Sequence, residues 1–338
     1  MTTSLLPRRT LGTNGPEITS VGFGAWATGG GGWSFGWGAQ DDDESISAIR
    51  HAVARGINWV DTAAVYGLGH SEEVVGRAIA GLPKSERPLV FTKCGLRWDE
   101  SDPMAVSVRD SSPARVRAEC EASLRRLGVE AIDLYQFHWP DQSGTPLQDS
   151  WGEMMRLQDA GKVRFIGVSN YDVRLLEGCE ALRHVQSLQP PFSMIRRDVA
   201  ASEIPWARAH GTGVVVYSPM QSGLLTDGFT AERVAAMAPD DWRRRAPHFQ
   251  EPNLGRNLAL RDALRPVAAR HGVDTGAVAV AWTLAWPGVT GAIVGARTAK
   301  QVDGWITAAG LHLDPEDLAA IAAAIERTGA GSGPSLPA

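Results

Sequence analysis

The chain has 338 residues, of which 43% are hydrophobic and 21% charged, so it can bury a large core in one closed α/β barrel or in two domains. Its formal net charge of -5 excludes the basic surface expected of a protein that binds nucleic acid or a membrane surface. Three widely spaced cysteines, no signal-peptide pattern and no apolar run of about 18 residues predict a cytoplasmic protein without membrane spans.

The first residues predict a small antiparallel hairpin ahead of the longer elements. Residues 8–19 are centred on the turn sequence Gly-Thr-Asn-Gly, and residues 21–24 then form an apolar strand. A loop rich in glycine and tryptophan follows at residues 26–40. The acidic residues 41–44 start a helix, because negative side chains are favourable at a helix N-terminus, and Gly56 ends it.

Strand and helix patterns alternate along the rest of the chain. Short apolar runs between turn residues predict strands, and apolar residues at helical spacing predict helices. The predicted strands are residues 21–24, 57–60, 89–93, 132–138, 163–168, 185–189, 214–217 and 292–294. The predicted helices are residues 41–56, a helix capped by Ser71, and residues 112–127, 147–160, 173–180, 203–210, 254–270, 275–285, 298–308 and 318–325. Eight such units without a shift in composition predict a single (β/α)8 barrel, or TIM barrel, with extra helices.

Two segments stand outside this alternation. Residues 218–253 show little periodicity and are too long for an ordinary strand-to-helix connection, so we expect a functional loop, often a lid, on the carboxyl face of the barrel. Residues 329–338 predict a flexible C-terminal tail after a barrel domain that spans residues 1–328.

Four ionisable residues lie at or just after the carboxyl ends of neighbouring predicted strands, where a barrel of this kind has its active site. Asp61 ends the second strand, Lys93 the third and His138 the fourth, and Tyr66 follows the second strand by a short loop. An ammonium at the end of an apolar strand needs a carboxylate partner, and Asp61 on the adjacent strand is within reach. We expect this cation to lower the pKa of Tyr66 toward a range useful for proton transfer, while His138 orients a substrate oxygen or passes a proton to Tyr66. Each residue alone is more often a buried polar group than a catalyst, but the four together predict a catalytic group.

Six separated motifs carry a resemblance to a known family. They are DTAAVYG at 61–67, FTKCG at 91–95, DLYQFHWP at 133–140, GKVRFIGVSN at 161–170, VVVYSPM at 214–220 and VGAR at 294–297. In order and approximate spacing they resemble the aldo-keto reductases, from about residue 11 to residue 327. The resemblance implies a (β/α)8 barrel that binds NADPH without a Rossmann domain and reduces aldehyde or ketone carbonyls to alcohols, reversibly. It also implies that Tyr66 is the general acid, that Lys93 lowers its pKa, that Asp61 holds Lys93 and that His138 positions the carbonyl.

The resemblance places the nicotinamide end of the cofactor at the ends of the fifth, sixth and seventh strands. Ser169, Asn170 and Gln189 resemble the residues that bind the carboxamide. Tyr217 resembles the aromatic residue that stacks on the nicotinamide ring. Ser218, Gly223 and Leu225 follow the seventh strand and would face the pyrophosphate. Small residues in this segment let the backbone approach the phosphate groups.

The adenosine end of the cofactor is assigned to the last strand-to-helix connection, which begins at Gly295. A helix N-terminus with an arginine is a natural phosphate site, and Arg297 resembles the clamp on the 2'-phosphate, with Thr298 and Gln301 as its helpers. A lone arginine is usually a solvated surface charge, but the preceding strand and glycine favour the phosphate interpretation. Trp305 stands where the family commonly has an asparagine that meets the adenine edge, and stacking could replace that contact.

Substrate recognition is assigned to the catalytic Tyr66 and His138 and to two tryptophans, Trp26 and Trp139. An aromatic residue in a barrel loop is more often there for packing than for recognition, so the substrate is predicted only as a small carbonyl or alcohol. We expect no nucleic-acid or membrane partner, and the sequence does not predict an oligomeric state.

Three other interpretations were weighed against this one. Residues 22–27 match a loose G-x-G-x-x-A dinucleotide pattern, but no helix follows them, so that pattern is rejected. The eight histidines show no paired metal-ligand spacing, so a metal hydrolase has no ligand set and we expect no metal site. A barrel that binds NADPH as a redox sensor or regulatory subunit with slow turnover stays open, although the complete set of four catalytic residues disfavours it.

Overall fold

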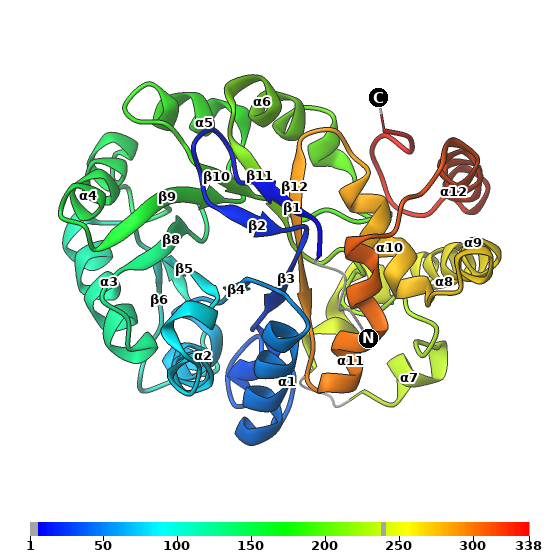
Figure 1. Ribbon diagram of the computed structural model, residues 1–338, viewed down its shortest axis with the longest axis horizontal. Helices are drawn as coiled ribbons and strands as arrows, with labels where there is room; N and C mark the ends of the chain where they lie inside the picture. Colours follow the sequence, from blue (N-terminus) through cyan, green and yellow to red (C-terminus); the bar gives the residue numbers. More distant parts are fainter. Residues whose placement is uncertain (1–5, 238–240, 338) are drawn as a thin grey trace.

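Eight parallel strands pair side by side and close into a barrel in the computed structural model, which describes residues 6–237 and 241–337 (Figure 1). The strands are β3 (Val21–Gly24), β4 (Trp59–Asp61), β5 (Leu89–Cys94), β8 (Ile132–Phe137), β9 (Val163–Ser169), β10 (Ser187–Gln189), β11 (Gly213–Val216) and β12 (Val289–Gly295). They follow one another around the ring in chain order, and β12 pairs with β3 to close it. The predicted (β/α)8 barrel is confirmed.

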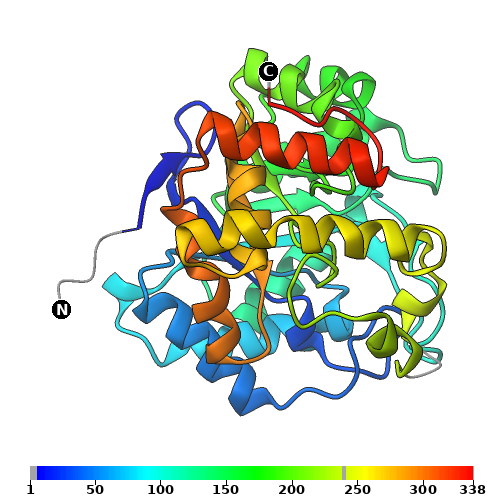
Figure 2. The ribbon, with the colours of Figure 1, turned by 90° about the vertical axis from the view of Figure 1, so that its right-hand side faces the viewer.

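Helices surround the barrel. They are α1 (Asp42–Ala54), α2 (His70–Ala80), α3 (Pro113–Leu127), α4 (Leu147–Asp159), α5 (Val173–Glu180), α6 (Glu203–His210), α7 (Ala231–Ala235), α8 (Asn253–Ala263), α9 (Arg265–His271), α10 (Thr275–Leu284), α11 (Ala299–Trp305) and α12 (Pro315–Thr328). Figure 2 shows α8 and α9 in line along one side of the barrel, with α12 packed beside them. None of the helices in the part of the chain that the structure describes is both long and apolar enough to cross a membrane.

Two helix predictions are corrected. The single helix expected at residues 254–270 is two helices, because Pro266 has no backbone N–H to continue α8 and instead occupies the first turn of α9. Ser71 does not cap α2, which begins one residue earlier at His70. The Ser71 hydroxyl instead donates a 2.7 Å hydrogen bond to the carbonyl of Ala25, so it fastens the helix to the loop after β3.

The predicted hairpin is also present, as β1 (Arg8–Thr10) paired with β2 (Glu17–Thr19), and it lies across the centre of the ring in Figure 1. Arg9 donates a 2.8 Å hydrogen bond to the carbonyl of Val289, at the start of β12. Leu11 and Ile18 are buried in one cluster with Trp59 inside the barrel. The hairpin therefore seals the amino-terminal end of the barrel and leaves the carboxyl ends of the strands for function.

The carboxyl face carries the long connections. An antiparallel ribbon that the sequence did not reveal, β6 (Leu96–Arg97) with β7 (Val108–Arg109), follows β5. The connection predicted at residues 218–253 is present and contains α7 and two short 3-10 helices, Trp242–Arg245 and Pro247–Phe249; its residues 238–240 lie outside the described residues.

The segment after α12 differs from the flexible tail that its composition suggests. Arg197 donates from its side chain to the carbonyls of Ala330 at 3.1 Å and Gly333 at 3.2 Å, and its amide donates to Ser332 at 3.0 Å. Gly331 has a φ of 65°, and a Cβ there would lie 1.9 Å from the carbonyl oxygen of Ile195. Glycine at this position therefore permits a close backbone contact, although in the sequence it suggests looseness.

Candidate active site

A buried ion pair forms the base of the site. The Lys93 ammonium donates to Asp61 Oδ1 at 2.5 Å and to the carbonyl of Thr62 at 2.9 Å, and both charged side chains are almost fully buried. The Gln189 amide donates to the other carboxylate oxygen of Asp61 at 2.9 Å. Burial raises the pKa of Asp61 and lowers that of Lys93, and the attraction between the two charges opposes both shifts. The pairing expected from the sequence is therefore present, and Gln189 supports it.

Tyr66 and His138 lie above this pair. Their rings meet edge to face with centroids 5.5 Å apart, and the Lys93 Nζ atom is 5.3 Å from the centre of the Tyr66 ring. The structure thus brings together the four residues that the sequence singled out, from β4, the loop after it, β5 and the end of β8.

The pKa of Tyr66 corrects one expectation. Burial raises the pKa of Tyr66 well above its ordinary value, and the negative charge of Asp61 and the neighbouring Tyr217 phenol add to the shift. The effect of burial outweighs that of Lys93, whose positive charge is largely balanced by Asp61 at 2.5 Å, so the net pKa of Tyr66 lies above and not below its ordinary value. Tyr66 is therefore protonated at neutral pH, which is the form that a proton donor needs.

His138 is held in its neutral form. Burial lowers the pKa of His138 well below its ordinary value, and the positive charges of Lys93 and Arg109 lower it further. Two hydrogen bonds fix the backbone of His138. Its N–H donates to the carbonyl of Cys94 at 2.9 Å, and its carbonyl accepts from the side-chain amide of Asn170 at 2.9 Å. A neutral imidazole at a fixed position can donate one hydrogen bond to a substrate oxygen.

The four predicted nicotinamide residues form one hydrogen-bonded group. The Tyr217 hydroxyl donates to Asn170 Oδ1 at 2.8 Å, the Asn170 amide donates to Ser169 Oγ at 3.0 Å, and the Ser169 hydroxyl donates to the carbonyl of Gln189 at 2.7 Å. Asn170 has a φ of 61°, so the chain turns sharply just after β9. A flat phenol ring beside amide and hydroxyl groups with remaining hydrogen-bond capacity fits a nicotinamide and its carboxamide.

The three residues predicted to face the pyrophosphate differ in their exposure and in their backbone contacts. Ser218 follows β11 with a φ of 56° and is partly exposed. The amides of Gly223 and Leu225 both donate to the carbonyl of Met220 at 3.2 Å, and the Leu225 side chain is completely buried. This segment therefore folds into a tight turn with the Leu225 side chain in the core, so that the predicted contact of residues 223 and 225 with a pyrophosphate stays a prediction about the backbone.

The predicted 2'-phosphate residues gather at the start of α11. The Arg297 guanidinium donates to Gln40 Oε1 and to the carbonyl of Ala39, so it is fastened to the end of the loop at residues 26–40. Gln301 accepts a 2.7 Å hydrogen bond from the Arg297 amide, and Thr298 is the N-cap of α11 just after the exposed Gly295.

The suggested role of Trp305 is wrong. Its side chain is only 3% exposed and belongs to the main hydrophobic core, so it is not available to stack on an adenine. Trp305 ends α11 three residues after the buried Val302, so the two side chains share the face of the helix that packs on the core.

Tryptophans line the mouth of the site. Trp26 stacks on Tyr66 with centroids 6.0 Å apart and on Trp242 with centroids 5.6 Å apart. Trp139 lies under the guanidinium of Arg109, 4.3 Å from its ring centre. Trp26 and Trp139 were predicted here, whereas Trp242 and Arg109 were missed, because they come from loops whose paths depend on tertiary contacts and show no periodicity.

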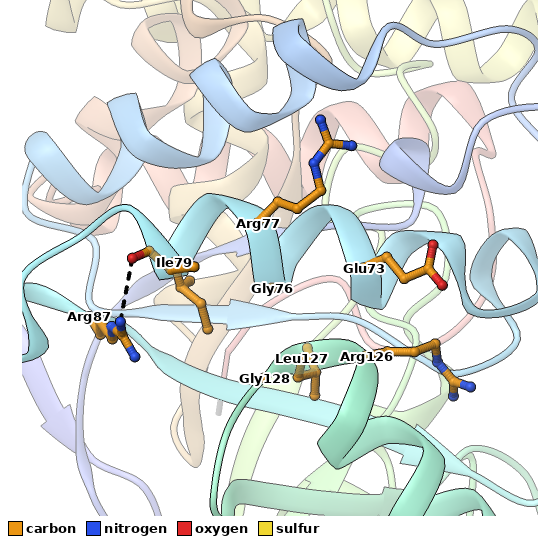
Figure 3. A pocket seen from close by; sticks show the side chains of 9 residues that line it. Glu73, Gly76, Arg77, Ile79, Arg87, Arg126, Leu127 and Gly128 are labelled. Atoms are coloured by element: carbon orange, nitrogen blue, oxygen red, sulfur yellow. Dashed lines mark hydrogen bonds between the residues drawn. The ribbon is translucent and has the colours of Figure 1, made fainter.

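A concavity lies away from these residues, on the outside of the barrel between α2 and the end of α3 (Figure 3). Its arginines are already engaged: Arg87 donates to the carbonyl of Ala80 at 3.4 Å, and Arg126 lies 2.6 Å from the buried carboxylate of Glu72. We therefore assign the active site to the barrel mouth.

Comparison with known proteins identifies the family. Residues 20–326 match the Aldo/keto reductase family. The chain is 35% identical over 319 residues to the "Aldo-keto reductase YhdN" of Bacillus subtilis (strain 168), covering 94% of this chain and 93% of the relative. It is 32% identical over 329 residues to the "NADH-specific methylglyoxal reductase" of Escherichia coli (strain K12), covering 94% and 98%. The glycerol dehydrogenase AKR11B4 from Gluconobacter oxydans has a similar structure, with a TM-score of 0.86, 37% identity and coverage of 99% of this chain and 98% of that chain. The chain therefore belongs to the aldo/keto reductase family, whose oxidoreductases use a nicotinamide cofactor and act on carbonyl or CH–OH groups.

Proposed function

We propose that this protein reduces the carbonyl group of small aldehydes or ketones to an alcohol with NADPH, and that Tyr66 is the general acid. The observation that carries the proposal is the meeting of a protonated phenol, a neutral imidazole and a buried ion pair at the carboxyl ends of β4, β5 and β8. Proton transfer to a carbonyl oxygen needs a donor and an orienting group at this spacing.

Each residue of the group has a distinct task in the proposed reaction. Reduced nicotinamide supplies, when bound, the hydride that adds to the carbonyl carbon. Tyr66 gives its proton to the carbonyl oxygen, and the neutral His138 donates a hydrogen bond that holds this oxygen in place. Lys93 lies beside the Tyr66 ring and stabilises the phenolate that proton transfer leaves. Asp61 holds Lys93 in place, and Gln189 in turn holds Asp61. In the direction of alcohol oxidation, the Tyr66 phenolate takes the proton back.

The choice of NADPH rests on Arg297 and its neighbours. Arg297 lies at the start of α11, where a phosphate group also meets backbone amides, and Thr298 and Gln301 stand beside it. Its contacts with Gln40 and Ala39 place the guanidinium next to the loop that carries Trp26. Since one relative is named as NADH-specific, titration of the protein with NADPH and with NADH tests this part directly. Tighter binding of NADH would contradict it.

Replacement of Tyr66 by phenylalanine tests the catalytic role. We expect Tyr66→Phe to lower kcat for carbonyl reduction by about 10²–10⁴-fold, the usual contribution of a general acid, with little change in NADPH binding. Consumption of the reduced cofactor with a panel of aldehydes, ketones and sugars measures the first quantity, and quenching of tryptophan fluorescence measures the second.

Tyr217→Phe is the matched control because it also removes one phenol hydroxyl, which here bonds Asn170. It should retain most of the proton-transfer rate. Equal turnover of the Tyr66→Phe variant and the unmodified protein would refute the role of Tyr66. Tight NADPH binding with negligible turnover on every carbonyl would instead favour a sensor or regulatory subunit.

A further inference from the structure

We propose that Arg109 forms an anion-binding subsite at the mouth of the barrel, so that the preferred substrates are aldehydes or ketones that carry a carboxylate or phosphate group. This inference rests on the proposed carbonyl reduction and adds the substrate class to it.

The position of Arg109 places a positive charge beside the reacting groups. Arg109 ends the ribbon strand β7 and pairs there with Leu96 of β6. Its guanidinium lies 4.3 Å from the centre of the Trp139 ring, and Trp139 directly follows the catalytic His138. The charge of Arg109 is close enough to contribute to the lowered pKa of His138. An anion on Arg109 would therefore lie near a carbonyl oxygen held by His138.

The nearby carboxylates do not neutralise Arg109. Within residues 6–237 and 241–337, its side chain has no carboxylate at ion-pair distance and no hydrogen-bond partner. Asp110, the next residue, lies 3.7 Å from Arg97 and accepts the Ser112 amide at 3.1 Å. The Asp141 carboxylate accepts hydrogen bonds from four backbone amides, those of Ser111, Ser143, Gly144 and Thr145. Both carboxylates are thus used by their own loops.

The stacking geometry leaves the guanidinium able to bind an anion. A guanidinium packed against an indole face is held by the cation–π attraction and keeps N–H donors at its edge for a bidentate contact with carboxylate or phosphate. Arg109 is also only partly exposed, and a partly dehydrated cation attracts an anion more strongly than one in open water. A ligand anion would supply the partner that the protein does not.

Matched substrate pairs test the subsite. Succinic semialdehyde and butanal differ by a carboxylate, and glyceraldehyde 3-phosphate and glyceraldehyde differ by a phosphate. We expect Arg109→Gln to lower kcat/KM for the preferred anionic substrate by about 10- to 100-fold, mainly through KM, because charge-assisted hydrogen bonds are lost. The neutral substrates should change by less than about threefold, since an uncharged substrate gains little from a guanidinium. The pair that shows the larger difference distinguishes carboxylate from phosphate.

Two further variants separate charge recognition from general damage. Arg109→Lys keeps the charge and should recover part of the lost kcat/KM for the anionic substrate. Arg97→Gln removes a charge from the other strand of the same ribbon, where Arg97 is half-exposed and faces Asp110, and should leave both substrate classes near the unmodified values. Equal losses for anionic and neutral substrates in Arg109→Gln, or a larger effect of Arg97→Gln, would overturn the inference.

A binding measurement keeps this inference separate from the proposed function. Calorimetric titration with succinate and with inorganic phosphate should show binding to the unmodified protein that is weakened at least about tenfold in Arg109→Gln, the loss expected for a charged hydrogen bond. Arg109-dependent anion binding without turnover of any carbonyl would refute carbonyl reduction but retain the anion site. Turnover of neutral aldehydes without any effect of Arg109 on anions would refute only the anion site.

Discussion

His138 couples the active site to the stability of the protein through its protonation. Its pKa is lowered well below the ordinary value, first by burial and then by Lys93 and Arg109. Below about pH 6.5, His138 therefore binds a proton in the unfolded chain but stays neutral in the folded chain. This difference in proton binding lowers the free energy of unfolding. We expect no effect of His138 on the free energy of unfolding well above about pH 6.5, and a growing loss as the pH falls from there toward the pKa of the folded state.

Urea unfolding at neutral pH and at several values below about pH 6.5 measures this loss in the unmodified protein and in His138→Gln. The variant has no imidazole to protonate, so its stability should fall less steeply over the same interval. Parallel curves for the two proteins would show that His138 does not contribute to the pH dependence.

At the scale of single residues, the positions of the four residues proposed to be catalytic could be predicted from the sequence, but their electrostatics could not. Asp61 is the last residue of one apolar strand and Lys93 the next to last of another, and this local pattern is sufficient to place them at the barrel mouth. The direction of the Tyr66 pKa shift depends on how completely Asp61 balances Lys93 and on how far the phenol is buried. Both are tertiary quantities with no trace in the local sequence.

At the scale of elements, the barrel interior depends on a glycine in β3. A Cβ at Gly22 would lie 2.1 Å from Cε2 of Trp59, whose indole is fully buried and donates a 2.8 Å hydrogen bond to the carbonyl of Thr19. We expect Gly22→Ala to lower the free energy of unfolding by about 1–3 kcal/mol, the usual cost of overpacking a core. Urea denaturation measures the change.

Gly152→Ala provides the matched control for this substitution. Gly152 is inside α4, and a Cβ there would meet no atom within 4 Å. Alanine should therefore raise the stability by about 0.5–1 kcal/mol through its better helix propensity. If Gly22→Ala were as stable as the unmodified protein, the close packing of Trp59 against β3 would be wrong.

Prediction of the elements succeeded where local signals are strong. The helices Val173–Glu180 and Glu203–His210 were placed without error, and the helix Pro113–Leu127 was placed to within one residue. In these helices the apolar spacing and the end signals agree. The ribbon of β6 and β7 and the path of residues 218–253 were missed. Their form depends on distant partners, such as Trp26 for Trp242 and Trp37 for Arg243, whose guanidinium lies 4.6 Å from the Trp37 ring.

At the scale of the whole molecule, closure joins distant parts of the chain. The pairing of β12 with β3 completes the ring, and the hairpin of β1 and β2 covers its amino-terminal end through contacts such as that of Arg9 with Val289. The count of strand-helix units was enough to predict this closure, because eight such units leave no unpaired edge. The contact of the C-terminal segment with the loop after β10 was not predictable, because glycine and serine residues give the same signal in a loose tail and in a tight turn.

The C-terminal segment therefore has a testable part in global stability. Arg197 is only 4% exposed, and burial lowers its pKa, so its guanidinium depends on the carbonyls of Ala330 and Gly333. Ending the chain at Gly329 removes both acceptors and leaves the guanidinium only its bond to the carbonyl of Met194, so we expect a loss of about 1–3 kcal/mol in the free energy of unfolding, the usual cost of buried donors left unsatisfied. Ending it at Gly333 is the matched control, because it keeps every contact with Arg197 and should unfold at the same urea concentration as the full chain. Equal unfolding midpoints for the two shortened chains would show that residues 330–333 are the loose tail suggested by their composition.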